Sequence, residues 1–338
     1  MKMAAGSLYK GLLIVLFILC DIAAAGQGDR FRTAEPFEYS SATVEATEEW
    51  KNREISYEDW AKGADLTVSL DQHLYRTVLP LVMEFAREND LDIAVKEGTC
   101  GISSGLLSRK AIDISALCCP VAEYDRLPGL TYHTVALGAI GIIVNEKNPL
   151  NSLTHMQVRE LFSGQVPRWR ALKTTEPVEL PDLPVRPVGR LHCKTRPGHW
   201  RMILDNEDLF GENLEEVGTI PDMVRAVSAY AGAIGHLRTW NYHIYGDKWK
   251  VKTLKINGIS PEDKEALLAG RYPYYSSYNL GTWEINGRKN PHAEALIEYL
   301  KKNIGSIDSR FVVASPMELR KAGWKFNGDE LVSPPEGK

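Results

Sequence analysis

The sequence predicts an α/β protein with a largely parallel sheet, and three observations support that fold class. Strand-like runs, turns and helical runs alternate from residue 64 onwards, which is typical of parallel sheets flanked by helices. The chain has 338 residues, of which 44% are hydrophobic, enough for a large core in two lobes. Residues 134–145 are almost wholly apolar, as expected of a strand covered on both faces.

The N-terminus has the pattern of a secretory signal peptide. Lys2 and Lys10 precede an apolar run, and three alanines follow at residues 23–25. The apolar run is short for a membrane span, so we expect a removable signal peptide over residues 1–25 and export to the periplasm. Residues 26–63 are polar, lack a clean period and predict an N-terminal arm.

The first half of the chain then follows in a regular order. A β-type run at residues 66–70 precedes apolar residues at helical spacing between residues 75 and 85. The next strand covers residues 91–95, and a Gly/Ser turn opens a helix within residues 96–111. A further strand runs over residues 112–120 and ends at a proline. This succession predicts parallel strands joined by helices.

The second half contains clear helix boundaries. Thr154 and Gln157 have the spacing of a capping box at a helix start. Residues 224–237 predict a helix, a glycine break and a short strand. Two later helices are expected, one over residues 260–270 and one that begins after Asn290 as N-cap.

The chain has five cysteines, and removal of the signal peptide takes away Cys20. The even number that remains predicts two disulfides in an oxidising compartment. Neighbouring Cα atoms lie about 3.8 Å apart, below the usual disulfide range of roughly 4.4–6.8 Å, so Cys118 and Cys119 are poor partners for each other. We therefore expect them to pair with Cys100 and Cys193, in one order or the other.

Residues 189–201, GRLHCKTRPGHWR, gather four basic side chains, two histidines and a cysteine without an acidic residue. Runs of charge are usually solvated faces. The whole chain nevertheless has a net charge of -4, which argues against a general nucleic-acid binder. The local cluster is therefore a candidate site for a small anion.

Four segments in consistent order carry a resemblance to a known family. They are EGTCGISSGLLSRKAIDISALCCP, LTHMQVRELFSGQVPRW, AVSAYAGAIGHL and YPYYSSYNLG. Over residues 64–320 the chain resembles the phosphate-binding proteins of ABC transporters, which belong to the type II periplasmic binding protein superfamily. The second and third segments are the most specific.

The resemblance implies a two-lobed α/β fold, with a mostly parallel sheet flanked by helices in each lobe and crossover hinge strands between them. Lobe 1 would combine residues 64–137 with residues 241–320, and lobe 2 would hold residues 138–240. Residues 321–338 are expected to be a frayed tail. The resemblance also implies a monomeric binding protein, not an enzyme, that needs no cofactor and delivers its solute to an ABC transporter permease.

The resemblance further implies a binding site for a small, phosphate-like anion. We expect Lys194, Thr195 and Arg196 to contact it, because arginine offers planar paired donors and lysine a point charge. The other expected contacts lie on the remaining ligand loops: Thr99, Gly101, Ser103, Ser104, His73 and Cys119.

Three ligand loops depart from the family pattern. The first loop usually offers a small hydroxyl residue, where this chain has His73. The strand after AID usually ends in serine followed by aspartate or arginine, where Cys118 and Cys119 stand. The fourth loop usually reads Gly-Ser-Gly-Thr-Arg, where residues 193–196 read CKTR.

A soft-metal site and a thiol-dependent enzyme are the alternatives. Thiolate and imidazole groups suit copper or zinc, and the candidate ligands are His73, Cys100, Cys118, Cys119, Cys193 and His199. Two cationic side chains at about 4 Å would each oppose every unit of positive charge on a metal ion by roughly 4 kcal/mol at an effective dielectric of 20, which favours disulfides. Cysteines near basic residues are activated thiolates in principle, so a thiol count separates these cases.

Overall fold

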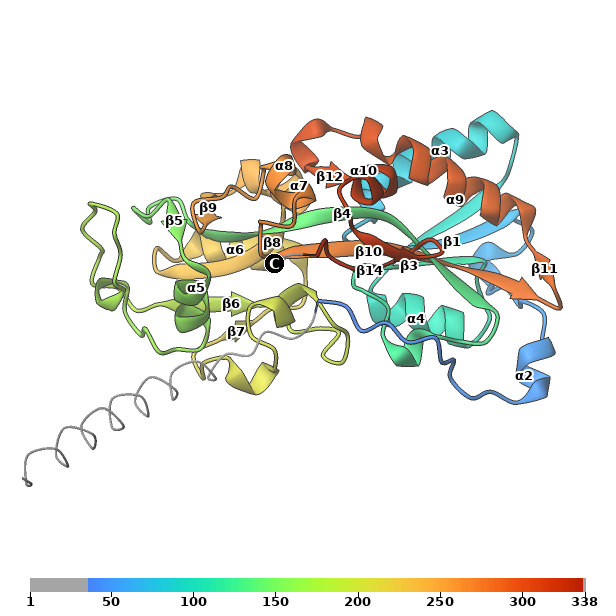
Figure 1. The fold of residues 1–338 in the computed structure, drawn as a ribbon, viewed down its shortest axis with the longest axis horizontal. Coiled ribbons are helices and arrows are strands. Elements are labelled where there is room, and N and C mark those ends of the chain that lie inside the picture. The colour runs from blue at the N-terminus through green and yellow to red at the C-terminus, as the bar shows by residue number, and fades with distance from the viewer. Residues whose placement is uncertain (1–35, 337–338) are drawn as a thin grey trace, which may run out of the picture.

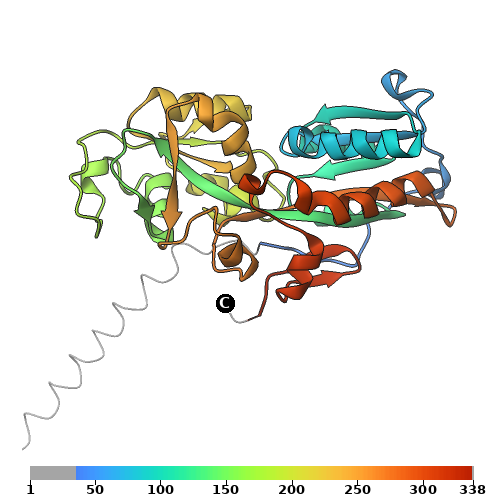
Figure 2. The same cartoon turned by 90° about the horizontal axis from the view of Figure 1, so that it is seen from above.

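The computed structural model describes residues 36–336, so the predicted signal peptide lies outside the described residues. Two α/β lobes lie along the long axis of the molecule (Figure 1), and the perpendicular view shows the same two halves (Figure 2). This confirms the predicted two-lobed α/β fold class. Within the described part of the chain, none of the helices combines the length and apolarity needed to cross a membrane.

Lobe 1 is built on three parallel strands, with β1 between β2 and β3. Its elements are β1 (Leu66–Asp71), α3 (Tyr75–Asn89), β2 (Ile93–Gly98), α4 (Cys100–Ser108), β3 (Ile114–Leu117), β11 (Arg288–Lys289), α9 (Pro291–Asn303) and β12 (Val313–Ala314). Figure 1 shows α3 and α9 on one face of this sheet and α4 on the other. Every residue of β1 is buried, because both faces of the strand are covered.

The long strand β4 (Leu130–Asn145) is shared by both lobes. Its first part pairs with β10 (Tyr275–Ile285), and that ladder ends at Ala139. From Ile140 onwards, β4 pairs with strands of lobe 2 instead. The chain returns to lobe 1 just before β10, where the Ile140 N–H donates to the carbonyl of Tyr274 at 2.9 Å. The two crossings therefore lie side by side.

Lobe 2 is formed by the middle of the chain. Its elements are β5 (Ser152–Leu153), α5 (His155–Phe162), β6 (Arg186–Gly189), β7 (Glu215–Glu216), α6 (Ile220–Ala229), β8 (Ala233–Arg238), α7 (Thr239–Tyr245), β9 (Val251–Ile256) and α8 (Lys264–Leu268). Strand β6 runs parallel to β7 and β8. Strand β9 pairs with β5 and with the lobe 2 part of β4, which differs from the predicted placement of residues 241–320 in lobe 1.

The predicted capping box at the start of α5 is confirmed. Thr154 accepts from the Gln157 backbone at 3.1 Å, and the Gln157 side chain accepts from the Thr154 backbone at 2.6 Å. Asn290 caps α9, also as predicted. Helix α8 begins later than the predicted Ser260, because the side chain of Asp263 accepts a backbone N–H of its first turn.

The described part of the N-terminal arm packs on lobe 1. It carries helix α2 (Glu48–Asn52), whose Trp50 ring lies 5.9 Å from the ring of Trp283. Lys110 is 1% exposed and donates to two backbone carbonyls of the arm, at 2.8 and 3.0 Å. The polar composition of the arm does not predict that it packs on lobe 1, because the contact depends on a few aromatic rings and backbone carbonyls.

The C-terminal segment is folded, so the predicted frayed tail is wrong over the described residues. After α10 (Pro316–Lys321), strands β13 (Lys325–Asn327) and β14 (Glu330–Ser333) form a hairpin. The buried Arg126 donates to both carboxylate oxygens of Glu330, at 2.9 and 2.7 Å. This ion pair fastens the hairpin to lobe 1.

Candidate functional site

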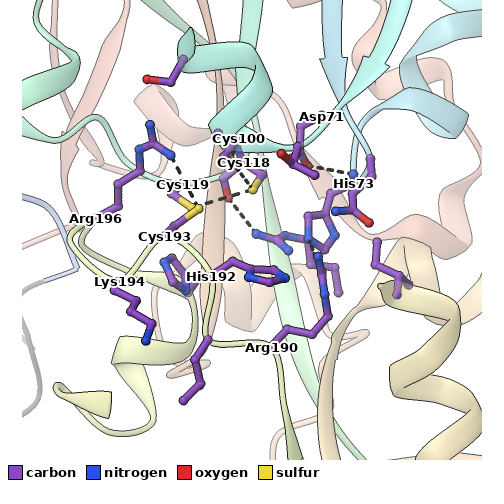
Figure 3. A pocket seen from close by; sticks show the side chains of 18 of the residues that line it. Asp71, His73, Cys100, Cys118, Cys119, Arg190, His192, Cys193, Lys194 and Arg196 are labelled. Carbon is purple, nitrogen blue, oxygen red and sulfur yellow. Dashed lines mark hydrogen bonds between the residues drawn. The ribbon is translucent and has the colours of Figure 1, made fainter. Parts of the chain in front are cut away.

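A cavity of about 690 Å³ lies between the two lobes. Its walls are the segments that follow β1, β2 and β3 in lobe 1, together with the ends of β6 and β8 in lobe 2. The carboxyl ends of parallel strands are the usual binding position in open α/β sheets. Figure 3 shows the side chains of this cavity from close by.

The end of β1 supplies two buried groups. Burial raises the pKa of Asp71 well above its ordinary value, and its carboxyl oxygen accepts the backbone N–H of His73 at 2.8 Å. Burial and the nearby Arg238 lower the pKa of His73 well below its ordinary value. A neutral imidazole satisfies both ring contacts, because Nδ1 donates to Asn241 Oδ1 at 2.8 Å and Nε2 accepts from Arg190 Nη1 at 3.2 Å.

Helix α4 begins at the cavity wall. The side chain of Thr99 caps it, and the backbone N–H groups of Cys100 and Gly101 belong to its positive first turn. Ser104 lines the cavity one turn further on. Ser103, which we also expected at the anion, is fully buried behind that wall and is not part of the lining.

Four cysteines converge on the cavity from loops of both lobes (Figure 3). Cys100 begins α4, Cys118 and Cys119 follow β3, and Cys193 follows β6. The Sγ atoms of Cys100 and Cys118 lie 2.9 Å apart, and those of Cys118 and Cys119 lie 3.8 Å apart. These three sulfurs all lie within 4.8 Å of one another. The Arg196 Nη1 group donates to Cys193 Sγ at 3.5 Å.

The two predicted disulfides are absent from the described residues, where all four cysteines are free thiols. Even the separation of 2.9 Å between Cys100 and Cys118 is longer than a disulfide bond of about 2.05 Å. Cys118 and Cys119 are not bonded to each other, as their adjacency in the sequence predicts. The sequence did not predict that all four side chains meet in one cluster instead of forming two separate pairs.

Hydrogen bonds among the four cysteines shift their pKa values in opposite directions. Bonds from the Cys100 and Cys119 thiols lower the pKa of Cys118 well below its ordinary value, and the charge of Arg238 acts in the same direction. Bonds from the same two thiols lower the pKa of Cys193 to about 3. Bonds to Cys118, Cys119 and Cys193 raise the pKa of Cys100. These shifts favour the thiolate form at Cys118 and Cys193 over the thiolate form at Cys100.

The cations that we expected to hold an anion already have carboxylate partners. Arg196 lines the cavity, is 3% exposed, and donates to both carboxylate oxygens of Asp125 at 2.8 and 2.6 Å. Lys194 Nζ lies 2.5 Å from a carboxylate oxygen of Glu207. Thr195 is exposed and is not part of the cavity lining. Arg196 therefore fixes its loop through a buried ion pair.

Two other arginines also line the cavity: Arg238, which was not predicted, and Arg190, which belongs to the predicted basic segment but was not among the expected anion contacts. Arg238 ends β8, donates to the carbonyl of Cys118 at 2.7 Å, and has a buried Nε without a partner. Arg190 follows β6 and contacts His73. A charged residue directly after the apolar strand GAIGHL was the available signal for Arg238. His199, a predicted metal ligand, and His236 also line the cavity, and each has a buried Nε2 without a partner.

Two solved structures of transport receptors share this fold. An ABC-type phosphate transport receptor from Vibrio cholerae aligns at a TM-score of 0.57 and 18% identity, over 74% of this chain and 100% of that chain. A putative phosphate ABC transporter substrate-binding protein with bound phosphate, from Clostridium perfringens, aligns at a TM-score of 0.59 and 14% identity, over 79% and 98%. At such identities the likeness shows a common fold.

The amino-acid sequence also matches a family model. The model is described as a PBP superfamily domain and matches residues 121–302. The matched range includes both crossings between the lobes and the loop that carries Cys193, Lys194 and Arg196. It spans more than half of the chain. The protein therefore belongs to the PBP superfamily domain family and has the two-lobed fold of phosphate-type periplasmic binding proteins.

Proposed function

We propose that this protein is an exported solute-binding protein that captures a small, phosphate-like anion in the cleft and supplies it to an ABC-type transporter in the periplasm. The two structural relatives, whose names describe phosphate transport proteins, support this class of function. The charge of the cleft supports an anion as the solute.

The observation that carries the proposal is the pair Arg190 and Arg238. Both line the cavity, and neither has a carboxylate within ion-pair distance among the described residues, unlike Arg196 and Lys194. Arg238 is 7% exposed, and Arg190 is partly buried. A buried charge without a counter-charge is costly, and a bound anion relieves that cost. Arginine also matches the planar, paired acceptors of an oxyanion.

The two lobes offer complementary donors to such an anion. Arg190 and Arg238 belong to lobe 2, whereas the first-turn N–H groups of α4 at Cys100 and Gly101 belong to lobe 1. Helix N-termini attract anions through free N–H groups and the helix dipole. An anion that contacts both walls stabilises the closed arrangement of the lobes, so binding and hinge closure are coupled.

Isothermal titration with phosphate, sulfate, arsenate and molybdate tests this proposal, with Arg190→Gln as the informative variant. A hydrogen bond to a charged group contributes about 1.5–3 kcal/mol, so R190Q is expected to weaken binding at least about tenfold. Arg186→Gln is the matched control, because Arg186 lies on the same segment but pairs with Glu215 at 2.9 Å outside the cavity. Absence of oxyanion binding in the wild-type protein, or equal affinity in R190Q, would overturn the proposal.

A further inference from the structure

We propose that the cysteines of the cleft form a binding site for a thiophilic d10 metal ion, Cu(I) or Zn(II), with the sulfurs of Cys100, Cys118, Cys119 and Cys193 as ligands. This site goes beyond the anion site proposed above and does not depend on it.

Three of the sulfurs lie near the spacing that a single ion needs, and the Sγ atoms of Cys100 and Cys118, at 2.9 Å, must move apart to bind it. Zn–S bonds of about 2.3 Å in a tetrahedron place sulfurs about 3.8 Å apart. The Sγ atoms of Cys118 and Cys119 are 3.8 Å apart, and those of Cys100, Cys118 and Cys119 all fall within 4.8 Å of one another. A bend directly after β3 turns the two adjacent cysteines so that their sulfurs are neighbours. Thiolate-rich sites select Cu(I) and Zn(II) among the common metals.

Burial and position separate this cluster from ordinary core cysteines. Cys100, Cys118 and Cys119 are only 1–5% exposed, yet all of them line the cavity. The fourth, Cys193, has a backbone φ of 60°, in the left-handed region that a non-glycine residue rarely occupies. Such strain persists where the surrounding structure imposes it, and it concentrates at functional sites. Here it lies on the loop that brings a sulfur of lobe 2 to the cavity wall, within hydrogen-bond reach of Cys100 and Cys119.

The charge of the cleft suits a metal–thiolate complex better than it suits a free dication. A Zn(II) ion with four thiolates is a dianion, and so is Cu(I) with three. Arg238 contacts the carbonyl of Cys118, and Arg196 donates to the sulfur of Cys193. Cations at these positions oppose a bare metal ion but stabilise the anionic complex once the thiolates surround the metal. The buried, unpartnered Nε of Arg238 and Nε2 of His199 are further groups in the cavity that lack a ligand.

The binding step needs no oxidant or reductant. Each metal–sulfur bond forms from a thiolate, and each cysteine that starts as a thiol releases one proton to solvent. The oxidation states of metal and sulfur do not change. Because Cys193 comes from lobe 2 and the other three from lobe 1, the complete complex also joins the two lobes.

Metal titration of the reduced, metal-free protein without its signal peptide tests the site. Co(II) serves as an optical substitute for Zn(II), because sulfur-to-cobalt charge transfer reports thiolate ligands. Cu(I) is titrated without oxygen against a chromogenic chelator. One ion per chain is expected, with three or four sulfur ligands in X-ray absorption spectra. The ion with the lower dissociation constant is the preferred ion.

Two variants and one control localise the ion. Cys118→Ser and Cys193→Ser are each expected to weaken binding more than the 10–100-fold that outer groups around a metal typically cost. Cys193 is only partly buried, so C193S tests the site without a change in the core. Ser306→Ala, in the exposed turn that follows α9 and outside the cavity, is expected to bind like the wild type.

The inference would be overturned if the reduced wild-type protein bound no stoichiometric ion, or if both cysteine variants bound the ion with unchanged affinity. It would also be overturned if peptide mapping showed that the four cysteines of the native protein are joined in disulfides. Phosphate titration of C193S separates this site from the anion site. Oxyanion binding without metal binding contradicts only the metal site, and metal binding without oxyanion binding contradicts only the proposed transport function.

Discussion

At the scale of single residues, the main lesson concerns the partners of charged groups. The family resemblance drew attention to Arg196, and the structure does place it at the cavity. Its carboxylate partner, Asp125, is 71 positions away in the sequence, and no local sequence pattern predicts such a pair. Sequence could therefore indicate which loop forms the cleft wall. It could not show that Arg196 has a buried carboxylate partner whereas Arg238 has none among the described residues.

The Arg196–Asp125 pair gives a stability prediction. Both side chains are almost fully buried, at 4% and 1% exposure, so Asp125→Asn leaves a buried guanidinium without its counter-charge. We expect the free energy of unfolding to fall by about 3–5 kcal/mol, as measured by urea denaturation. Asp182→Asn is the control, because the Arg168–Asp182 pair is about half exposed and such pairs contribute about 0–1 kcal/mol. Equal stability of D125N and D182N would contradict the structural role of the pair.

The cysteines show the same limit in another form. Their number and their adjacency were enough to reject a bond between Cys118 and Cys119. Whether the remaining thiols form pairs or one cluster depends on the distance between the loop at Cys193 and the end of β3, which lie in different lobes. That distance depends on how the two lobes are arranged, so the sequence left disulfides and a metal site as alternatives.

At the scale of elements, local rules succeeded wherever a helix carries its own start signal. The capping box of α5 and the Asn290 cap of α9 are both present. Failures occurred where tertiary contacts decide the structure. The hairpin of β13 and β14 is short, and it is held by the buried Leu331, by Arg126 and by a charge network around Asp329.

That network predicts a pH-dependent contribution to stability. Burial raises the pKa of Asp329, but bonds from Lys301 at 2.8 Å and His133 at 3.0 Å outweigh burial and hold the pKa below its ordinary value. A carboxylate with a lowered pKa stabilises the fold above its unfolded pKa of about 3.9, and this contribution is lost as the pH falls through the folded value. We expect Asp329→Asn to cost about 1 kcal/mol at neutral pH, with no difference from the wild type in strong acid.

Urea denaturation at a series of pH values measures this difference. Glu298→Gln is the matched control, because Glu298 also pairs with Lys301, at 2.7 Å, but its side chain is 68% exposed. Its effect is expected to be smaller at every pH. A constant gap between D329N and the wild type from neutral to acidic pH would contradict the assignment.

At the scale of the whole molecule, the sequence was sufficient for the fold class and insufficient for the border between the lobes. Alternating strands and helices predict an α/β protein. The periodicity of apolar residues does not predict which strands a given strand pairs with, or in which lobe. Strand β9 illustrates this limit, because only its pairing with β4 and β5 assigns it to lobe 2. The largest hydrophobic cluster also crosses the predicted border, since it contains residues of β4, β8 and the C-terminal hairpin.

Shared strands predict cooperative unfolding of both lobes. Strand β4 pairs with β10 in lobe 1 and with β8 and β9 in lobe 2, so neither lobe can lose its sheet without disrupting the other. We expect one calorimetric transition whose van't Hoff enthalpy equals the calorimetric enthalpy. Two resolved transitions in the scan would mean that the lobes unfold independently.

The adjacency of the two crossings also constrains how the cleft moves. At Ile140 and Tyr274 the chain passes between the lobes in two neighbouring, hydrogen-bonded segments. Two paired segments of this kind can bend perpendicular to their common plane, whereas sliding one past the other would break the hydrogen bonds between them. If the cleft opens and closes, we therefore expect the lobes to rotate about one axis, so that each closure returns Cys193 to the same wall of the cavity.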